Sequence, residues 1–216
     1  MASTPHAVHV EGLTRSFDGR AVIDGLRLDV RPGEFVALLG RSGCGKSTLL
    51  RVLAGLDRDI SGTVLVPRRK AVVFKAPRSM PWKRVWRNVL LGLPGRLDRT
   101  RAERALTEVD PERRSRPELL LLDEPFGALE GPARIKAQRL VGELWQRCGC
   151  AVLLATHDVA EALLLADRVL VMDAGVITYE TPVDLERPRD LADPRFAELR
   201  GLLVGRLRAD AAAEAA

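Results

Sequence analysis

A chain of 216 residues is long enough to fold as one large α/β domain and too short for two full ones. Hydrophobic residues make up 46% and charged residues 29%, a balance that excludes a disordered or fibrous protein. The 34 basic and 29 acidic side chains leave a net charge of +5, spread along the chain without a basic arm, so we expect no nucleic-acid partner.

The first half of the chain predicts mostly strands. The patterns indicate strand-like structure over 8–39, with a hairpin turn at Asp18–Gly19 and a buried strand at 35–39. A helix from Leu49, short strands at 64–66 and 71–74, and a charged helix at 99–109 follow in chain order. Leu49, Val52, Leu53 and Leu56 recur at helical spacing, and the Gly55 region is expected to end that helix.

The second half alternates between strand and helix. The predicted elements are strands at 119–122, 152–155 and 168–172, with helices at 134–147 and 159–166. This alternation indicates βαβ crossovers and therefore a parallel sheet. The Ala-rich end of the chain predicts a tail that frays.

Cysteine content and the lengths of the apolar runs indicate in which compartment the protein works. Cys44, Cys148 and Cys150 are too few for a disulfide framework and are expected to be reduced thiols. The Cys148–Cys150 spacing lacks the further ligands that a metal site needs nearby. The first residues show no secretory signal, and charge breaks every apolar run before the ~18 residues that a membrane span needs. Any membrane role would therefore be peripheral.

Residues 40–48 carry the strongest motif, Gly-Arg-Ser-Gly-Cys-Gly-Lys-Ser-Thr, which matches G-x-x-x-x-G-K-[ST] between a predicted strand and a predicted helix. The glycines let backbone N–H groups converge on phosphate oxygens, and the helix adds its positive N-terminal end. Lys46 is expected to reach the β- and γ-phosphates and the Ser47 hydroxyl to bind Mg²⁺. The candidate phosphate-binding residues are Gly40, Arg41, Ser42, Gly43, Cys44, Gly45, Lys46, Ser47 and Thr48.

Two more predicted strands end in polar residues. Leu119–Leu122 leads into Asp123 and Glu124, at the strand end where α/β sheets bind ligands. We expect Asp123 to hold Mg²⁺, through water, and Glu124 to polarise an attacking water. The strand at 152–155 ends at Thr156 and His157, and His157 is expected beside that carboxylate pair, in reach of a γ-phosphate. Ordinary structural roles for these side chains are the alternative.

The strings GRSGCGKST, LLLLDEP and ATHD, in this order, make residues 8–200 resemble the ATP-binding subunits of ABC transporters. The resemblance implies an α/β fold with a P-loop NTPase core, an N-terminal antiparallel β subdomain and a truncated helical subdomain. It implies one ATP-binding domain over 1–200, a tail over 201–216, and ATP with Mg²⁺ as cofactors. It assigns Phe17 to stacking on adenine, which suits an aromatic ring; a core position for Phe17 is the alternative.

The chain departs from the family pattern at three places. No LSGGQ-like string occurs, and the segment that carries it in the family is missing between residues 109 and 118. The Gln expected after the 71–74 strand is Lys75, which has no acceptor for Mg²⁺ or water and could instead contact a phosphate directly. The Asp expected in the loop after 119–125 is Glu130, the mildest of the three changes.

Finer features resemble the nitrate, sulfonate and taurine importers, with the aliphatic sulfonate type closest. They are the stretches 80–83, which contains Trp82, 87–89 and 181–189. Trp82 would then lie near the permease, unless it fills its own loop. The implied partners are transmembrane permease subunits, a solute-binding protein and a second copy of the chain, and the implied location is the cytoplasmic face of the cell membrane.

Three functions stay open on the sequence. The first is an energy-coupling subunit that hydrolyses ATP with Glu124 and His157. The second is a nucleotide-binding remnant without turnover, favoured by Lys75 and by the missing signature. The third is a P-loop kinase or another NTPase, which the His157 strand end and the Phe17 hairpin disfavour.

Overall fold

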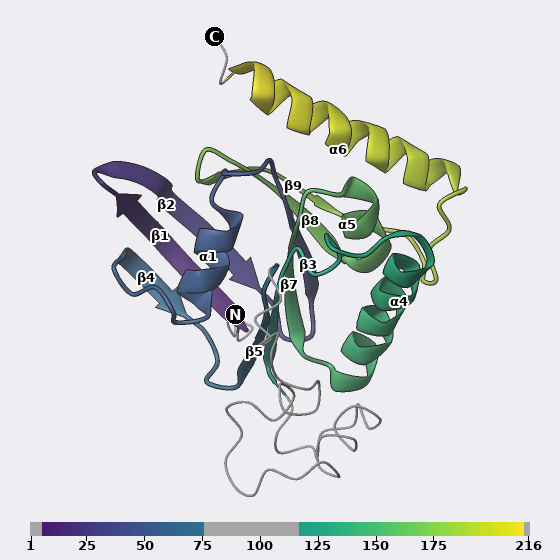
Figure 1. The fold of residues 1–216 in the computed structure, drawn as a ribbon, viewed down its shortest axis with the longest axis horizontal. Helices are drawn as coiled ribbons and strands as arrows, with labels where there is room; N and C mark the ends of the chain where they lie inside the picture. The colour runs from purple at the N-terminus through teal and green to yellow at the C-terminus, as the bar shows by residue number, and fades with distance from the viewer. Residues whose placement is uncertain (1–5, 76–116, 214–216) are drawn as a thin grey trace, which may run out of the picture. The chain divides into compact units, whose positions relative to one another are not determined.

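In the computed structural model of the protein, which describes residues 6–75 and 117–213, the strands form two sheets (Figure 1). The smaller sheet is antiparallel, in the order β2-β1-β4, and consists of β1 (Val8–Phe17), β2 (Arg20–Val30) and β4 (Ser61–Leu65). Its predicted hairpin turn is confirmed, since Asp18 and Gly19 take φ angles of 50° and 79°. This sheet corresponds to the antiparallel β subdomain that the sequence implies.

The larger sheet has the order β5-β6-β7-β3-β8-β9 and positions the candidate site. Its strands are β3 (Phe35–Leu39), β5 (Lys70–Val73), β6 (Leu119–Asp123), β7 (Ala151–Thr156), β8 (Arg168–Asp173) and β9 (Val176–Pro182). All neighbours pair in parallel except β8 and β9. Every residue of β3 and β7 is buried, as continuous apolar runs in the middle of a parallel sheet predict.

Helices cover both faces of this sheet (Figure 1), and each face has its own core. The described helices are α1 (Lys46–Leu53), α4 (Gly131–Cys148), α5 (Val159–Leu165) and α6 (Pro194–Ala213). One core joins Leu49 and Leu53 of α1 to Leu38 of β3 and to the antiparallel sheet. The other joins the opposite face of the strands to Leu163 of α5 and Phe196 of α6. The α/β fold expected from the sequence is therefore present.

Several details differ from the prediction. Helix α1 ends at Leu53, before Gly55 with its φ of 77°, so Leu56 lies outside the helix and is 62% exposed. Strand β9 and helix α6 were not predicted. Helix α6 runs across residue 200, where a tail was expected to begin, because Leu203 is buried in the core. The predicted helix at 99–109, the truncated helical subdomain, the missing signature segment and Trp82 lie outside the described residues.

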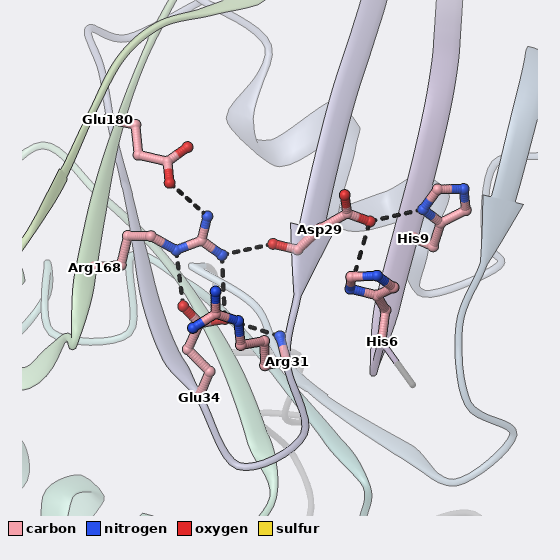
Figure 2. A network of polar contacts seen from close by, with 7 residues as sticks. All are labelled: His6, His9, Asp29, Arg31, Glu34, Arg168 and Glu180. Carbon is pink, nitrogen blue, oxygen red and sulfur yellow. Dashed lines mark hydrogen bonds and ion pairs between the residues drawn. The ribbon is translucent and has the colours of Figure 1, made fainter. Parts of the chain in front are cut away.

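Arg168 joins the two sheets through a network of polar contacts (Figure 2). Its guanidinium binds both carboxylate oxygens of Glu34, at 2.7 and 3.1 Å, and donates to Glu180 at 2.8 Å. It also donates to the backbone oxygen of Asp29 at 2.6 Å, and the Asp29 side chain contacts the His9 ring at 2.7 Å. Burial lowers the pKa of Arg168, but the hydrogen bonds to Glu34 and Glu180 outweigh it and raise that pKa. The Arg168 guanidinium therefore stays charged, and its hydrogen bonds fix its position.

Among the described helices, none is both long and apolar enough to cross a membrane.

We predict that Arg168→Met lowers the free energy of unfolding by about 2 kcal/mol, because Glu34, whose side chain is 11% exposed, loses its cation. Urea denaturation measures this. The matched control is Arg139→Met, which breaks an exposed pair with Glu143 one helical turn away and should cost about 0.5 kcal/mol or less. Equal losses in both variants would contradict the role given to Arg168.

Candidate functional site

The loop at residues 40–45 joins the carboxyl end of β3 to α1 and needs glycine for its path. Gly45, just before the helix, has a φ of 108°, a conformation that L side chains rarely adopt. A Cβ placed on Gly45 would lie 2.8 Å from the backbone oxygen of Val22. Glycine is therefore required at position 45 both by the backbone conformation and by the close approach of β2.

Lys46 lies at the start of α1 and is 5% exposed. Its Nζ donates to the backbone oxygens of Gly40 at 2.8 Å and Arg41 at 2.7 Å. The ammonium is thus held inside the curve of the loop, where phosphate oxygens would meet it.

Ser47 and Asp123 meet although 76 positions separate them in the sequence. The Ser47 hydroxyl donates to Asp123 Oδ1 at 2.9 Å, and Asp123, the last residue of β6, is 7% exposed. A hydroxyl and a carboxylate suit Mg²⁺, which prefers oxygen ligands and keeps several from water and substrate phosphates. Among the described residues no group of three or more His, Cys, Asp or Glu could hold a metal, so nucleotide and water would have to complete the set.

Glu124 is the point where three strand ends converge. It follows β6, has a φ of 44°, and its backbone N–H donates to Ala155 of β7 at 2.9 Å. Its carboxylate is 8% exposed and pairs with Lys75 Nζ, after β5, at 2.6 Å. His157 Nδ1, after β7, lies 3.5 Å from the same oxygen. The positive φ of a non-glycine residue is a strained conformation of the kind that gathers at functional sites.

Opposing effects set the charge of Glu124. Burial alone would raise the pKa of its carboxyl, and the hydrogen bond and charge of Lys75 act in the other direction. The charges of His157 and Lys46 add to the effect of Lys75, and the net result is a pKa below the ordinary value. Glu124 is therefore ionised at neutral pH and can accept a hydrogen bond.

Two cavities lie along the loop. One of about 180 Å³ is lined by Ser42, Gly43, Gly45, Lys46, Ser47, Thr48, Lys75 and Glu124. A second of about 490 Å³ is lined by Arg20, Ala21, Val22, Arg41, Ser42, Gly43, Cys44 and the β8–β9 turn at 173–175. The two cavities share Ser42 and Gly43. The two cavities therefore border the same part of the loop.

The structure brings most of the predicted site residues together and places Phe17 at the margin. Phe17 is 44% exposed, so the alternative core position is wrong. Its ring carries the Arg15 guanidinium 4.0 Å from the centroid. Phe17 itself does not line either cavity described above, but Arg20, its cross-strand partner, lines the second. Glu130 is exposed and precedes α4 as its N-cap without a side-chain capping bond.

A buried network below His157 was not predicted. Glu161 of α5, 5% exposed, accepts from Thr156 Oγ1 at 2.8 Å and from Gln138 Nε2 of α4 at 3.2 Å. These contacts fix the end of β7, from which His157 projects. Burial raises the pKa of Glu161, and the nearby charge of Asp158 adds to this. The signal in the sequence was a single carboxylate within the apolar stretch of residues 159–165.

Comparisons with known proteins identify the family. A family model described as ABC transporter matches residues 23–115. A protein of Streptomyces avermitilis, named aliphatic sulfonates import ATP-binding protein SsuB 1, is 71% identical over 233 aligned positions, which cover 97% of this chain and 90% of the relative. The chain belongs to the ABC transporter ATP-binding family. The alignment is longer than the 216 residues present here, so the relative has residues without a counterpart in this ABC protein.

Other relatives and solved structures agree with this membership. A protein of Paracoccus denitrificans, named aliphatic sulfonates import ATP-binding protein SsuB 2, is 60% identical over an alignment that covers 93% of this chain and 91% of the relative. A protein of Nocardia farcinica, named aliphatic sulfonates import ATP-binding protein SsuB 3, is 49% identical over 96% of this chain and 94% of the relative. A dimeric structure of the ATP-binding cassette MJ0796, bound to ADP and Pi in a post-hydrolysis state, matches with a TM-score of 0.72 at 22% identity. It covers 83% of this chain and all of that one, which shows the ABC cassette fold.

We predict that Glu161→Gln makes the protein less sensitive to rising pH. Because the pKa of Glu161 is raised, the folded protein keeps a proton that the unfolded chain releases, so its free energy of unfolding falls as pH increases above about 4.3. The amide lacks this dependence, and its stability relative to the natural chain should grow with pH. Urea denaturation across pH tests this, with the exposed Glu198→Gln as control. Parallel pH profiles for the natural chain and Glu161→Gln would refute it.

Proposed function

We propose that the protein is the ATP-binding, energy-coupling subunit of an importer of aliphatic sulfonates. The observation that carries the proposal is the 71% identity to the Streptomyces protein, over nearly the whole of both chains. Further relatives at 60% and 49% identity have the same kind of name. The loop at 40–45 and the polar residues after β6 and β7 supply groups suited to binding and cleaving a nucleoside triphosphate.

ATP would lie along the loop, with its phosphates in the smaller cavity. There the backbone N–H groups and the Lys46 ammonium face the phosphate oxygens. Ser47 and Asp123 would hold Mg²⁺, which supplies positive charge to the transferring phosphoryl group. The larger cavity would take the ribose and base, with the exposed ring of Phe17 beside Arg20, which lines that cavity.

Hydrolysis would use Glu124 and His157. The ionised carboxylate of Glu124 can accept a hydrogen bond from a water molecule and orient it toward the terminal phosphate. The His157 ring, 61% exposed and 3.5 Å from that carboxylate, is free to contact the phosphate from the end of the neighbouring strand. Both residues directly follow strands, which fixes their backbone positions.

The protein would work in an assembly. An importer of this kind needs permease subunits and a solute-binding protein, and the cassette would dock peripherally on the cytoplasmic face of the membrane. The related MJ0796 cassette was solved as a dimer, and a homodimer is the expected form here too. The sequence has no LSGGQ string, so such a dimer would offer the terminal phosphate fewer donors, and we expect slow turnover.

We predict that Lys46→Ala weakens ATP binding by about 100-fold or more, because the charged donor at the centre of the loop is lost. Isothermal titration calorimetry with the full chain measures this, and circular dichroism checks that the variant is folded. Lys136→Ala, on the exposed side of α4, is the matched control and should bind as the natural chain does. Unchanged affinity in Lys46→Ala would remove the loop from the ATP site.

We predict that Glu124→Gln reduces steady-state phosphate release from Mg·ATP by about 100-fold while ATP still binds, because the amide cannot take the charged role of the carboxylate. Phosphate release from the natural chain and the variant is measured side by side. Equal rates in both would show that Glu124 is not the catalytic carboxylate.

A further inference from the structure

The smaller cavity contains a second lysine, which the proposed function does not use. Lys75 and Lys46 both line it, against the single carboxylate of Glu124. With glutamine at position 75, the family pattern would leave one lysine facing one glutamate. The cavity of this protein thus has one positive charge more than that pattern supplies, at the place where phosphate would bind.

The ammonium of Lys75 lies beside the acidic residues at the end of β6. Its Nζ is 2.6 Å from Glu124 Oε2. The hydrogen bond and charge of Glu124, together with the charge of Asp123, raise the pKa of Lys75, so the side chain stays protonated. Lys75 is therefore a cation next to the two carboxylates that follow one another at the end of β6.

Lys75 can bind an anion in addition to Glu124. Its side chain is 59% exposed, whereas that of Glu124 is only 8% exposed. A lysine has a flexible stem and three donors, so it can keep one hydrogen bond to Glu124 and direct another toward an incoming anion. Lysine binds phosphate as a compact point charge, without the strict geometry that a metal or an arginine needs.

We propose that Lys75 is a built-in cation for the terminal phosphate, which lets this protein bind ATP with little dependence on Mg²⁺. The proposal rests on the nucleotide binding put forward above and adds to it a specific ionic requirement. Because Lys75 contacts Glu124, the carboxylate placed at the terminal phosphate, its effect should be larger for ATP than for ADP.

The experiment is calorimetric titration of the full chain with ATP or ADP, in excess Mg²⁺ and in excess EDTA. For the natural chain, removal of Mg²⁺ should weaken ATP binding by less than about 10-fold. In Lys75→Gln, the Kd for ATP in EDTA should rise by about 10-fold or more over that of the natural chain, the size expected for a lost charged hydrogen bond. The Kd for ADP should change by less than about 3-fold.

Two further variants separate local from general effects of charge. Lys136→Gln removes the same charge from the exposed side of α4 and should bind ATP in EDTA as the natural chain does. Lys75→Arg keeps the charge and should stay within about 3-fold of the natural chain. Equal losses in Lys75→Gln and Lys136→Gln, or no loss in Lys75→Gln, would overturn the proposal.

Failure of this inference is distinct from failure of the proposed function. If the natural chain binds ATP in Mg²⁺, Lys46→Ala weakens that binding as predicted and Lys75→Gln has no effect in EDTA, only the role of Lys75 falls. If the natural chain does not bind ATP in either condition, the nucleotide site itself is wrong, and the proposal for Lys75 falls with it.

Discussion

Parallel pairing of β3, β6 and β7 is the constraint on which the candidate site depends. In this pairing Leu39 lies opposite Thr156, and Asp123 lies opposite Ala155. The residues that follow each strand therefore emerge at one edge of the sheet, although they come from three distant parts of the sequence. The loop at 40–45, Glu124 and His157 owe their proximity to this register.

Burial at that edge strengthens the interaction between Glu124 and the charged groups around it. Glu124 is almost fully buried, which by itself would favour the neutral carboxyl, and Lys75 reverses this through a short ion pair. The same pair gives the cavity its second lysine. A single residue at position 75 thus influences both the charge of the candidate catalytic carboxylate and the attraction of the cavity for an anion.

Two arginines, Arg168 and Arg189, connect elements around the larger sheet through hydrogen bonds. Arg168 connects β8 to Glu34 and to the antiparallel sheet, while Arg189 donates to four backbone oxygens, among them Leu163 and Ala166 around the end of α5. Burial lowers the pKa of Arg189 to about 10, which still leaves it charged at neutral pH. These contacts satisfy carbonyls at the end of a helix that would otherwise lack partners. The contacts of Arg168 lie where β3 and β8 begin, at the edge of the sheet opposite the strand ends that carry the site.

The sequence by itself determined the features that depend on local chemistry. The hairpin at Asp18–Gly19, the buried strand β3 and the loop before Lys46 follow from turn residues, apolar runs and a motif that each occupy a few neighbouring positions. Strand β9 was missed because its residues are exposed or only partly buried, and a short run of that kind has a weak signal.

Only the tertiary structure decided the contacts between distant residues. The pairing of Lys75 with Glu124, the meeting of Ser47 with Asp123 and the buried bonds of Glu161 each join separate elements. The sequence showed which residue types were present, including the lysine where the family has glutamine. It could not show which oxygen each would reach, because hydrogen bonds and ion pairs depend on distances of a few ångströms that the strand register and helix packing set.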